Sequence, residues 1–189
     1  MRQNANTPAK RLYLVADFQV VGERYGIDYH FPQLKETQAT SPVLRGDVEE
    51  MTLSSGISLT HSDVHVLQPY ETTSRHSSPL YMLVVLEGCV TLTLGDDEYV
   101  VRSGMAFSAR LSEEQVMGAR HDADCTLKTL SFGVYPSAAR REGLLESLLL
   151  EWQNQKIPGF IWQVPDHVLS GIEHAQRQGV SALSRRLLL

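Results

Sequence analysis

The stretch that decides the fold is LYMLVVLEGCVTLTLGDDEYVVRSGMAF, which runs from Leu80 to Phe107. Two apolar runs of strand length are separated by Gly88, and the letters GDD after them predict a turn. A return strand then covers Glu98–Arg102, and the letters SGM predict a second turn into another strand. The stretch therefore predicts the centre of a small antiparallel β-structure.

Strand-like segments flank this centre on both sides. RLYLVADFQVV, which starts at Arg11, is rich in β-branched and aromatic residues, and CTLKTLSFGVY, which starts at Cys125, alternates between apolar and polar residues. In ISLTHSDVHV the two-residue period of a strand places His61, Asp63 and His65 on one face. Many short strands at this spacing predict a sandwich or a barrel.

The pattern changes at Pro136, after which apolar residues recur at helical spacing. A first helix is expected from about Ser137 to Pro158, a second over Asp166–Gln178, and a third from Ser181. The apolar stripe of the first helix consists of Leu144, Leu145, Leu148, Leu149 and Trp152.

These patterns predict two parts, a β-barrel over residues 1–135 and a helical segment over residues 136–189. The third helix reaches the end of the sequence with three leucines and no capping residue. We therefore expect that the chain is a fragment of a longer protein, the alternative being a short apolar tail packed onto the barrel.

Composition excludes several classes of protein. The net charge is −5 and basic residues form no run, so this chain is not expected to bind nucleic acid by itself. The first residues lack the apolar run of a signal peptide, and no stretch approaches the roughly 20 apolar residues of a membrane span. The sequence predicts a cytoplasmic protein without membrane contact.

The central stretch resembles the cupin pattern, in which VLEG is a turn between strands and GDDEYVVRSGMAF matches the second motif. The resemblance implies a jelly-roll barrel, which in metal-dependent cupins holds the ion with three histidines and one glutamate. Counted from the turn glycines, these four positions are occupied by Ser74, His76, Tyr81 and Phe107. One imidazole does not hold a catalytic metal, so we expect a cupin-like barrel without metal or cofactor.

Other catalytic arrangements are equally hard to find. His61 and His65 are four residues apart, which is about 13 Å along a straight strand and too far for one ion. The sequence has no GxSxG elbow, and neither cysteine has a histidine at a recognised spacing. The sequence therefore predicts a protein that is not an enzyme.

The order of the parts carries a second resemblance. A cupin-like barrel without metal ligands, the segment LSFGVYP and the ending SALSRRLLL together resemble the N-terminal regulatory half of AraC/XylS-family transcription regulators. The pyochelin-regulator-like branch of that family is the most similar. The resemblance implies a homodimer that binds a small-molecule effector, siderophore-like or another organic ligand. DNA would be bound only through a C-terminal helix-turn-helix domain that is absent from this chain.

Site residues follow from the two resemblances. The former ligand positions Ser74, His76, Tyr81 and Phe107 point inward in cupins, so they are candidates for effector binding, although Tyr81 and Phe107 equally suit core filling. Two basic side chains nearby, Arg75 and Arg110, are candidates for an anionic group of the effector. The leucine stripe of the first helix is the candidate dimerisation surface, the alternative being that it packs on the barrel.

The sequence leaves two other functions open. One is a stand-alone cupin enzyme, an isomerase or dioxygenase, with a non-standard metal site that uses His61, His65 or His76. The other is a structural or storage barrel. A metal analysis of protein purified without chelators separates the enzyme from the sensor.

Overall fold

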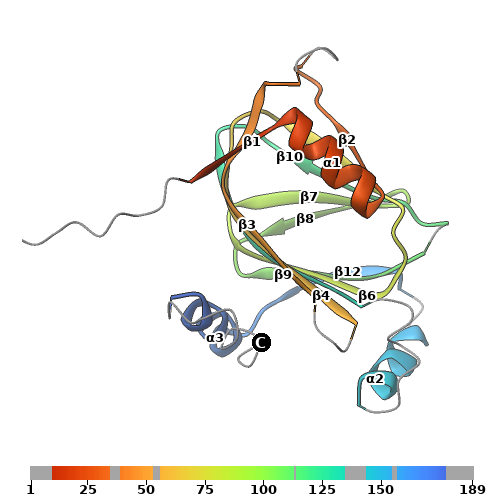
Figure 1. Ribbon diagram of the computed structural model, residues 1–189. Coiled ribbons are helices and arrows are strands. Elements are labelled where there is room, and N and C mark those ends of the chain that lie inside the picture. Colours follow the sequence, from red (N-terminus) through yellow and green to blue (C-terminus); the bar gives the residue numbers. More distant parts are fainter. Residues whose placement is uncertain are drawn as a thin grey trace, which may run out of the picture.

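The computed structural model describes residues 10–34, 39–52, 56–112, 114–134, 144–154 and 157–177. Two antiparallel β-sheets face each other in it (Figure 1). In spatial order the seven-stranded sheet comprises β1 (Arg11–Leu14), β3 (Pro42–Thr52), β4 (Ile57–Val66), β11 (Cys125–Val134), β6 (Ser78–Glu87), β9 (Met105–Leu111) and β12 (Gly159–Gln163). The five-stranded sheet comprises β2 (Ile27–His30), β5 (Tyr70–Ser74), β10 (Met117–His121), β7 (Cys89–Leu94) and β8 (Asp97–Arg102). The helices are α1 (Val15–Tyr25), α2 (Leu144–Gln153) and α3 (Asp166–Arg177). The predicted mainly-β class with C-terminal helices is thus confirmed.

The opening stretch of the sequence links the two sheets. β6 lies in the seven-stranded sheet, whereas β7 lies in the five-stranded sheet, so the chain changes layers at Gly88. Gly88 has φ +88, and a Cβ atom there would lie 2.3 Å from the carbonyl oxygen of Thr126. Only glycine fits this crossing, because a side chain would meet the backbone of β11.

The N-terminal segment differs from its prediction. The strand expected from Arg11 onward ends at Leu14, and helix α1 follows it. The Asp17 carboxylate accepts a hydrogen bond from the Leu14 backbone N–H at 2.8 Å and so caps the start of the helix. Phe18 is buried beneath the helix. The β-branched composition was misleading here, because capping and the burial of one helical face outweigh intrinsic strand propensity.

The segment predicted to be helical also contributes a strand. β12 pairs with β9 at the edge of the seven-stranded sheet, and Gly159 in it lies so close to Phe107 that a Cβ atom would be 2.9 Å from the ring. Helix α3 begins at Asp166 as predicted, and α2 is confirmed from Leu144 onward. The predicted start of the first helix at Ser137 and the whole third helix lie outside the described residues.

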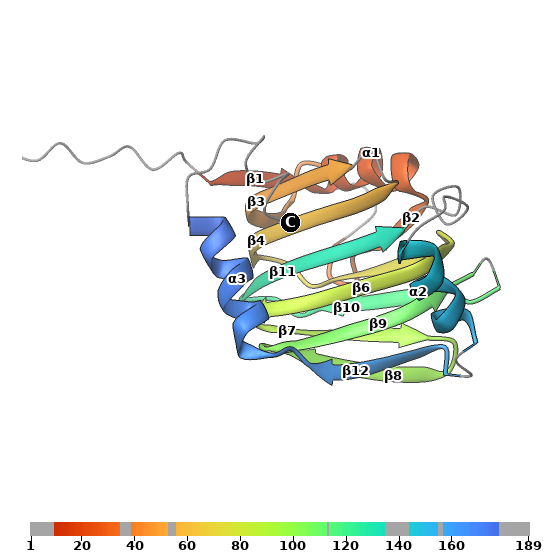
Figure 2. The same ribbon diagram turned by 90° about the horizontal axis from the view of Figure 1, so that it is seen from below.

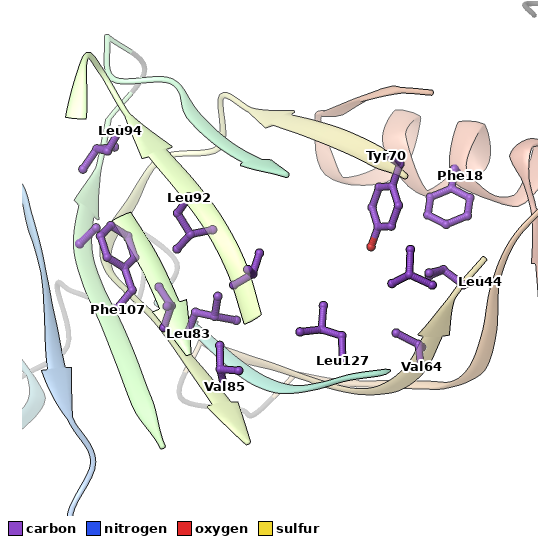
Figure 3. Close-up of a cluster of buried hydrophobic side chains, with 14 of the residues drawn as sticks. Phe18, Leu44, Val64, Tyr70, Leu83, Val85, Leu92, Leu94, Phe107 and Leu127 are labelled. Carbon is purple, nitrogen blue, oxygen red and sulfur yellow. The ribbon is translucent and has the colours of Figure 1, made fainter. Parts of the chain in front are cut away.

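The core lies between the two sheets (Figure 3). β-strand alternation sends Val85, Leu92, Leu94 and Phe107 inward, where each is almost fully buried. Complete burial of such a side chain stabilises the fold by about 1.5–3 kcal/mol. Figure 2 shows α2 and α3 near opposite ends of the seven-stranded sheet. None of the helices in the described ranges is long and apolar enough to cross a membrane.

Candidate ligand-binding cavity

A cavity of about 410 Å³ lies between the two sheets and extends to helix α1. This volume lies within the range of about 300–1,000 Å³ that is usual for small-molecule sites. Its walls come from α1, from β1, β3, β4, β6, β9 and β11 of one sheet, and from β2, β5, β7 and β10 of the other. The jelly-roll arrangement therefore surrounds a space that the core side chains leave unfilled.

One wall of the cavity is made of small hydroxyl-bearing side chains. Alternation along β4 directs Ser58, Thr60 and Ser62 inward, and alternation along β11 does the same for Thr129 and Ser131. Ser58 donates a hydrogen bond to the backbone carbonyl of the neighbouring strand at 3.2 Å. Short side chains at these positions leave room for a ligand, and their hydroxyls offer it both donors and acceptors.

The opposite wall is aromatic. The rings of Phe18 and Tyr29 meet edge to face with centroids 5.0 Å apart, and Phe18 lies 5.5 Å from the ring of Tyr70. The imidazole of His121 stacks on Tyr70 with centroids 4.2 Å apart and an interplanar angle of 4°. The stack arises because His121 and Tyr70 are directly opposite each other in the β10–β5 pair.

Two phenols belong to the lining, the buried Tyr70 and the partly buried Tyr81. Burial raises the pKa of Tyr81 to about 12 and that of Tyr70 well above its ordinary value of 10, so both hydroxyls stay protonated at neutral pH. Neither hydroxyl forms a hydrogen bond within the described part of the protein. Figure 3 shows the Tyr70 ring projecting into the barrel with its oxygen toward the centre.

His121 is a neutral group at pH 7. Burial lowers its pKa from 6.5 to about 4, against smaller opposing effects of the Tyr70 backbone and the Asp122 charge. The Nδ1 atom is buried, and none of the described residues forms a hydrogen bond with it. His121 therefore presents an uncharged imidazole to the cavity.

The charged side chains of the lining are acidic. Asp17 and Glu50 line the cavity, whereas no lysine or arginine does so among the residues that the structure describes. Asp17 forms an ion pair with Arg11 at 3.0 Å, and Glu50 accepts a hydrogen bond from the Tyr25 hydroxyl. Glu50 is exposed to solvent, so its charge is screened at the edge of the cavity.

The structure brings together some of the predicted effector-binding residues. Ser74, His76 and Tyr81 line the cavity. Phe107 does not, because its ring is fully buried in the core and lies 4.8 Å from that of Tyr99. Their role in binding stays a prediction.

The two basic candidates lie elsewhere. Neither Arg75 nor Arg110 belongs to the lining of the cavity, and both are exposed. The guanidinium group of Arg110 donates a hydrogen bond to the carbonyl oxygen of Gln153 at 2.9 Å, at the end of helix α2. Contact between an effector and either arginine stays a prediction, and the lining of this cavity does not support it.

The four positions that correspond to cupin metal ligands do not fit a divalent ion. Together Ser74, His76, Tyr81 and Phe107 supply one imidazole, one hydroxyl, a protonated phenol and a phenyl ring, without a carboxylate. Elsewhere in the described ranges, no three His, Cys, Asp or Glu side chains are grouped so that they would hold a metal. We therefore derive no chemistry through a metal.

The candidate dimerisation stripe has mixed surroundings. Leu149 is only 1% exposed and packs on Val134 of β11, as expected from the alternative in which the stripe covers the barrel. The Trp152 ring lies 5.6 Å from that of Phe160 on β12. The side chains of Leu144, Leu145 and Leu148 lie outside the described residues.

Sequence reasoning did not identify the aromatic wall. Phe18 lies in the segment that the sequence predicts to be a strand, and Tyr29, Tyr70 and His121 come from strands of only four or five residues. The one available signal was the segment YETTS, where Tyr70, Thr72 and Ser74 share a face. Which face of it points inward depends on the pairing of β5 with β2 and β10, which are distant in sequence.

Comparisons with known proteins agree with this architecture. Residues 45–188 match the protein family described as "Regulatory protein PchR N-terminal domain". The AraC-like transcriptional activator CuxR has a similar structure, with a TM-score of 0.56 at 8% identity over 95% of this chain and 64% of CuxR. A cupin domain of an XRE-family regulator from Enterobacter cloacae has a TM-score of 0.39 at 11% identity, and it covers 50% of this chain and 98% of that domain.

A further similar structure is ToxT from Vibrio cholerae, with a TM-score of 0.44 at 10% identity over 70% of this chain and 52% of ToxT. No curated protein sequence matches the chain significantly. The family match covers most of the chain, and the barrel with its helices has the expected cupin-like form. The chain therefore belongs to the family described as the regulatory protein PchR N-terminal domain.

Proposed function

We propose that this chain is the effector-sensing and dimerisation domain of an AraC-type transcription regulator in the cytoplasm. The observation that supports the proposal most directly is the cavity of about 410 Å³ between the sheets of a regulatory-family barrel. An apolar cavity with a few polar groups is the usual form of a small-molecule site. The cupin ligand positions lack a metal-binding set, which favours sensing over catalysis.

DNA binding is assigned to a helix-turn-helix domain outside these residues. The chain spans 64% of the length of CuxR, and its net charge of −5 does not suit contact with phosphates. Helix-turn-helix proteins commonly bind two half-sites as dimers, which supports a homodimer. On helix α2, Leu150 lies outside the predicted stripe, but it is 56% exposed and is an additional candidate for the contact with a second copy.

The enzyme alternative has little support from the positions of the histidines. His61 and His65 do not line the cavity, and His76 is the sole member of that trio in the lining. A catalytic ion would need further ligands beside His76. Stoichiometric iron, manganese or zinc in protein purified without chelators would favour the enzyme.

Effector binding is tested by native mass spectrometry of the chain purified from its own host. We expect a retained organic molecule of a few hundred daltons, consistent with the cavity volume. The variant Ser62→Phe fills the cavity and is expected to lose that molecule. The matched control Thr126→Phe adds the same ring at an exposed position and is expected to retain it. Two results would count against a site in the cavity. In one, both variants retain the molecule; in the other, neither the wild type nor the Thr126→Phe control retains it.

Dimerisation is tested with a fusion of the chain to an unrelated DNA-binding domain that represses its operator only as a dimer. We expect repression by the wild-type fusion and its loss in Leu150→Glu. Val20→Glu places the same charge on α1, where Val20 is 67% exposed, and is expected to leave repression unchanged. A wild-type fusion that does not repress, while sedimentation shows a monomer, would refute the dimer.

A further inference from the structure

We infer that the cavity binds an uncharged, planar organic molecule whose acceptor atoms, such as carbonyl oxygens, accept hydrogen bonds from the hydroxyls of Tyr70 and Tyr81. This inference rests on the proposed function, because it names the chemical class of the effector. It also replaces the expectation of an anionic group held by arginine.

The cavity contains two phenol hydroxyls that can donate hydrogen bonds, those of Tyr70 and Tyr81. Tyr70 is 7% exposed and Tyr81 is partly buried, and neither hydroxyl has a hydrogen-bond partner among the described residues. Neither oxygen is enclosed by protein atoms, so each hydroxyl faces cavity space that water or a ligand can fill. Both groups line the cavity, so an acceptor inside it would pair with them. The protonated phenols donate, which selects acceptor atoms in the ligand.

The charge of the described lining disfavours an ionic ligand. An anion inside the cavity would lose its hydration without gaining a buried cationic partner. The described lining contains no lysine or arginine, His121 is neutral at pH 7, and the other histidine of the lining, His76, is exposed to solvent. A cation would gain little, because Asp17 is already paired with Arg11 and Glu50 is exposed at the edge. An uncharged molecule avoids both costs of desolvation.

The shape of the cavity walls suits a flat ligand. The parallel stack of His121 on Tyr70 and the nearby ring of Phe18 form an aromatic surface against which a flat ring can pack. The opposite wall of short hydroxyl side chains leaves space for its polar substituents. A bicyclic aromatic molecule is well within a volume of about 410 Å³.

Three naphthalene probes of nearly equal size test the charge preference. They are 2-naphthamide, which is neutral and carries a carbonyl group, 2-naphthoate, which is an anion, and 2-naphthylmethylamine, which is a cation at pH 7. Binding to the full chain is measured by isothermal titration calorimetry. We expect the amide to bind at least tenfold more tightly than either ion and to lose binding in Ser62→Phe. An anion or cation that binds as tightly as the amide would overturn the inference, and so would an amide that does not bind.

Three variants test the donors. Tyr70→Phe and Tyr81→Phe keep the rings and are each expected to weaken amide binding about three- to tenfold, the usual effect of losing one hydrogen bond. Tyr99→Phe removes a hydroxyl outside the cavity and is expected to change nothing. Equal affinity in all three variants would show that the phenols contact only water, which refutes the inference. The proposed function is tested separately, by the native mass spectrometry and the fusion to a DNA-binding domain. A negative result with the naphthalene probes or the tyrosine variants would therefore leave the proposed function standing.

Discussion

Gly88, at the turn between β6 and β7, offers a sharp test of the layer crossing. The change Gly88→Ala is expected to destabilise the fold far more than Gly95→Ala, a change in the next turn. Both glycines have positive φ, +88 and +61 respectively. Their surroundings differ, because a Cβ atom at Gly88 would lie 2.3 Å from the Thr126 carbonyl oxygen, whereas one at Gly95 meets nothing within 4 Å.

The magnitude follows from two effects. An alanine in the left-handed region costs about 1–2 kcal/mol at either position. At Gly88 the contact with a backbone oxygen cannot be relieved by rotating a side chain, so the turn or β11 must shift, which adds about 1–3 kcal/mol. Alanine also restricts the unfolded chain more than glycine does, which stabilises the folded state by about 0.4–1 kcal/mol. This effect is the same in both variants and cancels in the difference between their free energies of unfolding. We therefore expect Gly88→Ala to destabilise the fold by about 1–3 kcal/mol more than Gly95→Ala does.

Urea unfolding followed by circular dichroism measures both variants. With a slope of about 3 kcal/mol per molar urea, each kcal/mol moves the midpoint by about 0.3 M. The midpoint of Gly88→Ala should therefore lie about 0.3–1 M below that of Gly95→Ala. Equal midpoints would mean that Gly88 lies farther from the Thr126 backbone of β11 than the structure shows. The described crossing between the two sheets would then be wrong.

Three further predictions concern the core, the buried imidazole and helix α2. Phe107→Ala should destabilise the fold by about 3–5 kcal/mol in the same urea assay, because its ring is fully buried; a cost below 1 kcal/mol would show that it lies at a solvent-filled cavity. Burial depresses the folded-state pKa of His121 to about 4, so below pH 6.5 the unfolded chain binds the proton more readily than the folded chain does. The free energy of unfolding should therefore fall by about 3 kcal/mol on account of His121 as the pH falls from 6.5 to 4. His121→Gln should flatten that part of the curve of stability against pH. Leu149→Ala should cost about 2–5 kcal/mol, because Leu149 packs on Val134, whereas Leu150→Ala at an exposed position should cost less than about 0.5 kcal/mol; similar costs would place α2 differently on the barrel.

Prediction of the site from the sequence was less complete than prediction of the fold. The metal-ligand positions of cupins led to Ser74, His76 and Tyr81, which do line the cavity. The same reasoning included Phe107, which lies in the core because the cavity reaches only part of the space between the sheets. A register count indicates which side chains point inward, but it cannot indicate how far along the barrel the interior is filled.

The sequence by itself determined the strands of the central stretch, their turns at glycine and the helices that follow, because these depend on local periodicity and on backbone freedom. Only the tertiary structure decided that the segment after Arg11 becomes helix α1 and that β12 joins the sheet. It also decided that Tyr70 and His121 stack beside an open cavity. These features depend on which distant strands pair and on which faces are buried together, and no local pattern contains that information.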